Sequence, residues 1–141
     1  SDIHPCLTYD DAGAAIEWLC RAFGFTRQLV VPGPDGMVIH SELSLGTGVI
    51  MVSSPKPDAQ RFGPRSAGGS AATLSVTIDD PDAHAERAVA AGAILVRPVQ
   101  DEEYGGRGYM AEDVEGHRWY FGTYRPGAYW SAADESKAGA E

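Results

Sequence analysis

Histidine and carboxylate side chains are the groups in this sequence most able to bind a metal or move a proton. His40 and Glu42 stand two residues apart in an alternating segment, so in a strand both would point to the same face. A histidine beside a carboxylate can act as a base or supply two metal ligands. His4 is a third residue that could join them. Two interpretations therefore stay open: an improvised site around His4, His40 and Glu42, or a polar sheet face exposed to solvent.

The two other histidines point to structural roles. His84 falls inside a predicted helix beside charged neighbours, which favours a surface position. His117 follows a turn glycine, and alternation places it with Trp119 on the face opposite to Tyr120. We therefore predict that His117 supports the last hairpin.

Aromatic residues gather in the last third of the sequence. They are Tyr104, Tyr109, Tyr120, Tyr124, Tyr129 and Trp130. Pockets for flat organic molecules are lined in this way, with a few polar groups that fix the ligand's orientation. Arg107 and Arg118 lie nearby in the sequence and are suited to hold an anionic group. The predicted ligand-binding residues are His40, Glu42, Tyr104, Arg107, Tyr109, Arg118 and Tyr120.

Composition and charge exclude several classes of partner. The 141 residues are 43% hydrophobic and 22% charged, which is typical of a globular domain. The formal net charge of −9 disfavours nucleic acid and favours a cationic small molecule. No apolar run approaches the roughly 20 residues that cross a bilayer, so no membrane partner is expected. Cys6 and Cys20 are too few for a disulfide framework, which favours the cytoplasm.

The elements that would position these residues form an internal repeat. A helix is predicted over 12–23, after Asp10 and Asp11 and before Gly24, which suits a left-handed cap. The pattern returns at Asp79-Asp80-Pro81, and Gly92 closes the second helix. In both halves a short apolar segment precedes the helix and three strand-like runs follow it.

The repeat predicts an α+β fold of two βαβββ modules, whose mixed sheet would curve around a cleft. Strands are expected over 4–9, 27–31, 37–45, 48–53, 72–78, 94–97, 108–113 and 117–124. We expect one domain over 1–130, with module 1 at about 3–54, a linker over 55–70, module 2 at about 71–125 and a flexible tail over 131–141. Alternation would turn Val38, His40, Glu42 and Ser44 to one face and Ile39, Ser41, Leu43 and Leu45 to the helix side.

Three segments resemble the vicinal oxygen chelate superfamily, which contains glyoxalase I, extradiol dioxygenases, fosfomycin-modifying enzymes and bleomycin-resistance proteins. They are HPCLTYDDAGAAIEWLCRAFGF at 4–25, IHSELSLGTGVIMV at 39–52 and EDVEGHRWYFGTY at 112–124. Val114 stands where this family usually has proline. The resemblance spans about residues 3–125 and implies the fold more than any one activity, because the superfamily hosts many chemistries.

The resemblance also implies four metal-ligand positions, two in each module. Carried over to this sequence, they fall on His4, Met51, Thr73 and Tyr120. Only His4 is a ligand of the nitrogen and carboxylate kind that Zn, Ni, Fe or Mn sites use. We therefore expect no metal cofactor of the family's type.

Three functions remain open. The first is a binding protein of the bleomycin-resistance kind, which sequesters a small aromatic or cationic molecule without a metal. The second is a divalent-metal-dependent lyase, isomerase or dioxygenase with an atypical site at His4, His40 and Glu42. The third is a metal-independent enzyme that uses tyrosine and arginine groups. The resemblance also implies a homodimer, because family members of this length are commonly dimeric. The cleft could then be shared between two chains.

Overall fold

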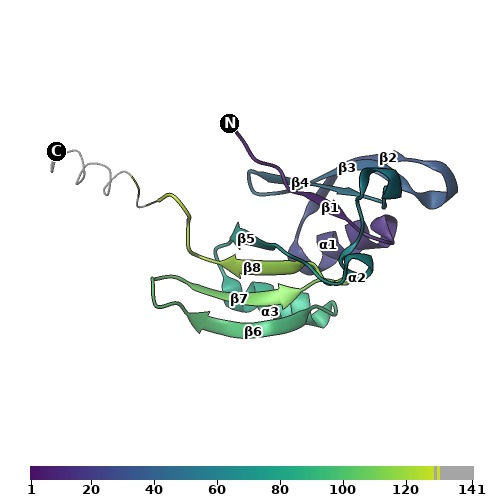
Figure 1. Cartoon of the computed structure of the whole chain (residues 1–141). Helices are drawn as coiled ribbons and strands as arrows, with labels where there is room; N and C mark the ends of the chain where they lie inside the picture. Colours follow the sequence, from purple (N-terminus) through teal and green to yellow (C-terminus); the bar gives the residue numbers. More distant parts are fainter. Residues whose placement is uncertain (129, 131–141) are drawn as a thin grey trace.

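The computed structural model describes residues 1–128 and 130, and both predicted βαβββ modules are present (Figure 1). The expected tail over 131–141 and Tyr129 lie outside the described residues. Module 1 contains β1 (Cys6–Thr8), α1 (Ala12–Phe23), β2 (Thr26–Pro32), β3 (Val38–Leu45) and β4 (Gly48–Ser53). Module 2 contains β5 (Thr73–Thr77), α3 (Pro81–Ala90), β6 (Ile94–Asp101), β7 (Arg107–Glu112) and β8 (Arg118–Gly122).

Each module forms its own four-stranded mixed sheet. The strand order is β1-β4-β3-β2 in sheet 1 and β5-β8-β7-β6 in sheet 2. The first strand of each module runs parallel to the last, and the remaining pairs are antiparallel. The α+β class is thus confirmed, with two separate sheets in which β1 and β5 are edge strands.

Local sequence explains where the helices begin and end. The Asp11 side chain accepts a hydrogen bond from the Ala14 amide at 3.1 Å, and Asp80 does the same for Ala83. These aspartates satisfy amides that the first helical turn leaves unpaired. Gly24 ends α1 with φ of 89°, a left-handed conformation that disfavours residues with a Cβ.

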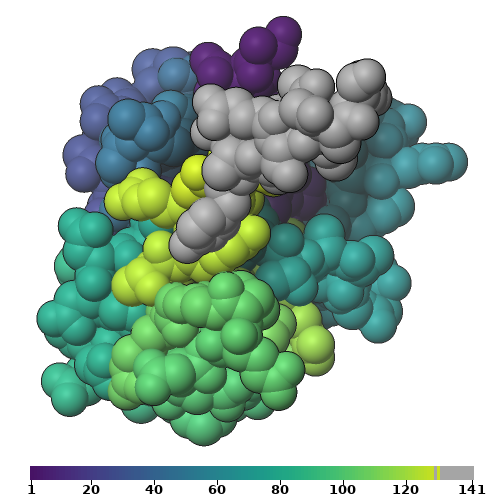
Figure 2. Space-filling model, turned by 90° about the vertical axis from the view of Figure 1, so that its left-hand side faces the viewer, coloured from purple at the N-terminus to yellow at the C-terminus, as the bar shows by residue number. Residues whose placement is uncertain are grey.

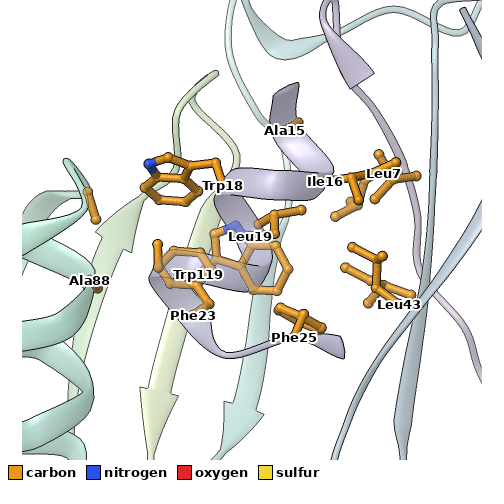
Figure 3. Packing of buried hydrophobic residues seen from close by; sticks show 14 of the residues in the cluster. Leu7, Ala15, Ile16, Trp18, Leu19, Phe23, Phe25, Leu43, Ala88 and Trp119 are labelled. Atoms are coloured by element: carbon orange, nitrogen blue, oxygen red, sulfur yellow. The ribbon is translucent and has the colours of Figure 1, made fainter. Parts of the chain in front are cut away.

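The two helices lie between the sheets and join the modules in one core (Figure 3). Figure 3 shows Ile16 and Leu19 of α1 near Leu7 and Leu43 of sheet 1. On the other side, the Phe23 ring lies 5.3 Å from that of Trp119 in β8. Because both sheets turn one face to this core, their opposite faces, called here the outer faces, point away from the helices.

Three details differ from the sequence-based expectation. Val38 is buried and Ile39 is 48% exposed, the reverse of the predicted alternation, because the β2–β3 pairing shifts register at the start of β3. β6 continues past Pro98 to Asp101, since register shifts along this edge strand accommodate the proline. The linker contains the 3-10 turn Pro57–Ala59 and the one-turn helix α2 (Pro64–Ala67).

None of the helices in the described part of the chain has the length and apolar character needed to cross a lipid bilayer.

Candidate functional site

The outer face of sheet 2 carries a group of aromatic and charged side chains around Tyr120. The Tyr120 hydroxyl donates to Oε1 of Glu102 at 3.3 Å and accepts from the Tyr104 hydroxyl at 3.5 Å. Arg97 forms an ion pair with Glu102, and its guanidinium carbon lies 5.9 Å from the centroid of the Tyr120 ring. Tyr104 also meets Tyr124 edge to face at 5.0 Å. We call these five residues the Tyr120 cluster.

Backbone geometry explains why the cluster forms at this place. Register pairs Tyr120 with Ser75 of β5 and with Met110 of β7, which sets it on the outer face. A Cβ added at Gly108 or Gly122 would overlap the Tyr120 ring, so the ring lies directly over these two glycines. Figure 2 shows the green loop between β6 and β7 beside the yellow segment after β8, where Tyr104 and Tyr124 meet.

Tyr120 is a neutral phenol in this setting. Burial is the main cause that raises its pKa well above the ordinary tyrosine value, with the Tyr104 hydrogen bond and the Glu102 charge adding to it. The side chain therefore supplies a ring face and a neutral hydroxyl.

The outer face of sheet 1 carries the predicted pair of His40 and Glu42. Nε2 of His40 lies 2.7 Å from Oε2 of Glu42, and both side chains are about 40% exposed (38% and 41%). Register places Met51 beside Glu42, and Cys6 beside Met51. The pair therefore faces solvent among sulfur-containing neighbours.

The structure does not gather all seven predicted ligand-binding residues. Tyr104 and Tyr120 lie together, and Arg118 shares their outer face, where it pairs with Glu112 at 3.4 Å. His40 and Glu42 belong to the other sheet, and no hydrogen bond or ion pair between described residues joins the two outer faces.

Arg107 and Tyr109 lie on the helix side of β7, the opposite side from Tyr120. Arg107 binds Asp82 of α3 and Asp101 of β6. Tyr109 is 0% exposed, and its hydroxyl lies 2.6 Å from Nδ1 of His84. Side chains alternate along β7, so both residues lie on this side of the sheet. The prediction grouped them with Tyr120 because they are near it in the sequence, and it did not take this alternation into account.

The four positions that the family resemblance marks for a metal do not fit one. Nδ1 of His4 lies 3.3 Å from the Val49 carbonyl oxygen, Met51 and Thr73 offer a thioether and a hydroxyl, and Tyr120 is protonated. First-row divalent metals are held by imidazole, carboxylate and thiolate groups. Among the described residues, no group of three or more histidine, cysteine, aspartate or glutamate side chains is placed to hold a metal ion.

A groove of about 980 Å³ separates the two edge strands. Its walls come from β1, the start of β4, β5 and the core residues Phe25 and Trp119, with Arg125 at its border. The unpaired edge strands β1 and β5 both border this groove. Strand edges of this kind are available for pairing with another chain.

Polar contacts join the modules around the buried Asp113 and around the half-buried His84, and the sequence had not revealed either group. Asp113 accepts from the Tyr9 hydroxyl at 2.5 Å and from the Trp119 indole at 2.9 Å. Nε2 of His84 lies 2.8 Å from the Phe23 carbonyl oxygen. The expectation of a surface role for His84 is therefore wrong, because the half-buried ring lies between α1 and β7 and has a partner on each nitrogen.

His117 has the structural role that alternation predicted. Its Nε2 donates to the Thr8 carbonyl oxygen at 2.9 Å, and its ring lies 4.6 Å from the Tyr9 ring. This contact links the last hairpin to β1.

Arg97 and Glu102 are site residues that the sequence analysis missed. The expected strand ended at Arg97, so nothing indicated on which face its side chain would lie. A signal was available in the polar run after Pro98, which continues an edge strand and then turns at Gly105 and Gly106.

Comparison with known proteins agrees with this geometry. Residues 3–121 match the family model described as the Glyoxalase/Bleomycin resistance protein/Dioxygenase superfamily. The observed fold, two βαβββ modules that each form one sheet, is the fold of this class of protein. The chain belongs to the glyoxalase/bleomycin resistance protein/dioxygenase superfamily.

Particular relatives come from several bacteria. The protein Mb0911c of Mycobacterium bovis, described as uncharacterized, is 35% identical over 123 residues, which cover 85% of this chain and 81% of the relative. The crystal structure of TioX from Micromonospora sp. ML1 has a TM-score of 0.70 and 34% identity, covering 86% of this chain and 94% of TioX. The fosfomycin resistance protein FosX from Mesorhizobium loti shares the fold, with a TM-score of 0.64 at 19% identity over 89% of this chain and 93% of FosX.

Proposed function

We propose that this protein binds a small aromatic or cationic molecule without a metal and leaves it chemically unchanged. The Tyr120 cluster is the observation that carries the proposal. It stands at one of the family's metal-ligand positions and replaces a ligand set with ring faces, a neutral hydroxyl and a guanidinium. Aromatic surfaces with a few fixed polar groups are typical of sites for flat organic molecules.

The donor set supports binding without a metal. His4 is the one residue of the four that suits a divalent ion, and a single imidazole holds such an ion weakly. The alternative metal site would need His4 beside His40 and Glu42, whereas the described contacts of His4 are with the backbone of β4.

We further propose that a second copy of the chain completes the cleft. The outer faces expose apolar side chains, including Leu29 and Val31 on sheet 1 and Ile94 on sheet 2. The unpaired edges of β1 and β5 border a groove that a partner's strands can enter. A homodimer would set sheet 1 of one subunit opposite sheet 2 of the other, which encloses the ligand between them.

Sequestration of an aromatic antibiotic is the role that fits such a site, in a reducing compartment such as the cytoplasm, where Cys6 and Cys20 remain thiols. Binding energy would come from ring stacking and apolar burial. The acidic surface would attract cations, an effect that fades with salt.

A titration with proflavine, an aromatic cation, tests the proposal with chelator present throughout and tryptophan fluorescence as the signal. Tyr120→Ala should weaken binding roughly tenfold, about 1.4 kcal/mol, because a stacked ring is lost. Phe62→Ala is the matched control, since Phe62 is an exposed aromatic residue of the linker. Binding that disappears with chelator, or chemical turnover of the added compound, would contradict sequestration.

A further inference from the structure

Arg97 stands out within the Tyr120 cluster because part of its guanidinium is buried without a partner. Nη2 is bound to Glu102, whereas Nη1 is shielded from solvent and has no hydrogen-bond partner among the described residues. A desolvated donor without an acceptor is unfavourable, and native proteins rarely keep one without a reason. An incoming acceptor atom would relieve this cost.

The carboxylates of the outer faces are already paired. Glu42 binds His40, Glu102 binds Arg97, and Glu112 binds Arg118. Tyr120 is uncharged, so the cluster offers a cation ring faces and no free negative charge. The unpaired group is a donor, and its natural partner is an oxygen acceptor such as a carbonyl or a carboxylate.

The most exposed part of the Tyr120 cluster is Tyr104, which lies in the loop between β6 and β7. Tyr104 is 59% exposed, and its hydroxyl is held by a long 3.5 Å contact to Tyr120. Gly105 and Gly106 follow it with φ of 98° and 88°, at a turn between β6 and β7. Displacement of the Tyr104 side chain would break this long hydrogen bond and the edge-to-face contact with Tyr124, and it would leave more room beside Tyr120.

We infer that the ligand is an aromatic molecule that carries a carbonyl or carboxylate oxygen, and that Arg97 Nη1 donates to this oxygen while the ligand's ring stacks on Tyr120. This inference rests on the proposed function and narrows it: an aromatic acceptor binds better than an aromatic cation of the same size. Arg97 is then the residue that determines specificity.

Three probes with one ring system test the inference: 2-naphthoate, 2-naphthamide and 2-naphthylmethylammonium, titrated into the full chain by calorimetry. We expect the two carbonyl compounds to bind at least tenfold more tightly than the ammonium compound. Arg97→Lys keeps a positive charge to pair with Glu102 but lacks the second guanidinium nitrogen, Nη1. This variant should therefore lose the preference for the carbonyl compounds over the ammonium compound. Arg21→Lys, an exposed arginine of α1, is the control and should preserve it.

The outcomes separate the inference from the function on which it rests. Equal or tighter binding of the ammonium compound, or an unchanged preference in Arg97→Lys, would overturn the inference while leaving aromatic binding in place. Failure of all three probes to bind at millimolar concentration would overturn both. If Arg97→Lys does not fold, the double variant Arg97→Met/Glu102→Gln removes donor and partner together and should show the same loss of preference.

Discussion

The Tyr9 hydroxyl is fully buried and donates to a carboxylate from the other module, at 2.5 Å from Oδ2 of Asp113. Burial and the adjacent carboxylate raise its pKa well above the ordinary tyrosine value, so it stays a donor across the physiological range. The same carboxylate accepts from Trp119 and, through Oδ1, from the amides of Glu115 and His117. This carboxylate thus links Tyr9, next to β1, with β8 and the last turn through four hydrogen bonds.

Tyr9→Phe should therefore lower the free energy of unfolding by about 2 kcal/mol, because a hydrogen bond to a buried charged acceptor is lost. Tyr104→Phe removes an exposed hydroxyl at a long contact and should change stability by less than about 0.5 kcal/mol. Urea unfolding followed by tryptophan fluorescence measures both. Equal effects of the two substitutions would show that Asp113 gains little from Tyr9.

At the scale of elements, His84 ties α3 to α1 and β7. Its Nε2 donates to the Phe23 carbonyl oxygen, so its Nδ1 accepts from the Tyr109 hydroxyl, and this pattern requires a neutral ring. Burial is the main cause that lowers its pKa below the ordinary histidine value, with the Arg87 charge acting in the same direction. The folded state thus binds a proton less readily than the unfolded chain does.

The direction of the pH dependence follows from that difference. The stabilisation from His84 is complete above pH 6.5, the ordinary histidine pKa, and is lost as the pH falls below it toward the lowered folded-state pKa. We expect His84→Gln, which keeps one donor and one acceptor, to lose less stability than the native protein between pH 7.5 and 5.0. Urea midpoints at the two pH values measure this. Equal losses in the two proteins would show that His84 is not the cause of the pH dependence.

Two glycines of α1 should respond in opposite directions to alanine. Gly13 has negative φ and open space around a built Cβ, so Gly13→Ala should stabilise the protein by about 0.5–1 kcal/mol through helix propensity. Gly24 has φ of 89°, and a Cβ there would meet Nη1 of Arg87 at 3.2 Å. Gly24→Ala should therefore destabilise by about 1 kcal/mol or more. Thermal melts of both variants check the signs.

At the scale of the whole molecule, the placement of the outer faces predicts a cleft shared by two chains. Light scattering should give a mass of twice 15.0 kDa. A variant that carries both His40→Ala and Glu42→Ala alters the side of the cleft that sheet 1 supplies. Tyr120→Ala alters the side that sheet 2 of the other subunit supplies. Mixing the two variants after subunit exchange should restore about one intact cleft per four chains, because half of the dimers then combine two native walls. A mass of 15.0 kDa, or no recovery on mixing, would contradict the shared cleft.

Metal analysis is the second test at this scale. With methionine, threonine and tyrosine at three of the four family positions, we expect no stoichiometric transition metal in the purified protein. Elemental analysis of native protein and of His4→Ala makes the comparison. One equivalent of metal that His4→Ala removes would show that His40 or Glu42 completes a site.

The repeated βαβββ pattern could be predicted from the sequence alone, because helix caps, turn glycines and periodic apolar residues are local signals. It placed α1 at 12–23 and β4 at 48–53, as observed. It also singled out Tyr104 and Tyr120, which lie together, since both stand near the glycine-rich turn and the last strand.

Which residues face one another depends on the three-dimensional packing and could not be predicted from the sequence. A register shift reversed Val38 and Ile39, and burial between modules turned His84 and Tyr109 into partners. The sheets turn the same faces to a shared core, which separates His40 and Glu42 from Tyr120 within one chain. Which distant segments contact each other depends on packing across the whole core. The hydrophobic pattern of one segment does not show which other segment it will contact.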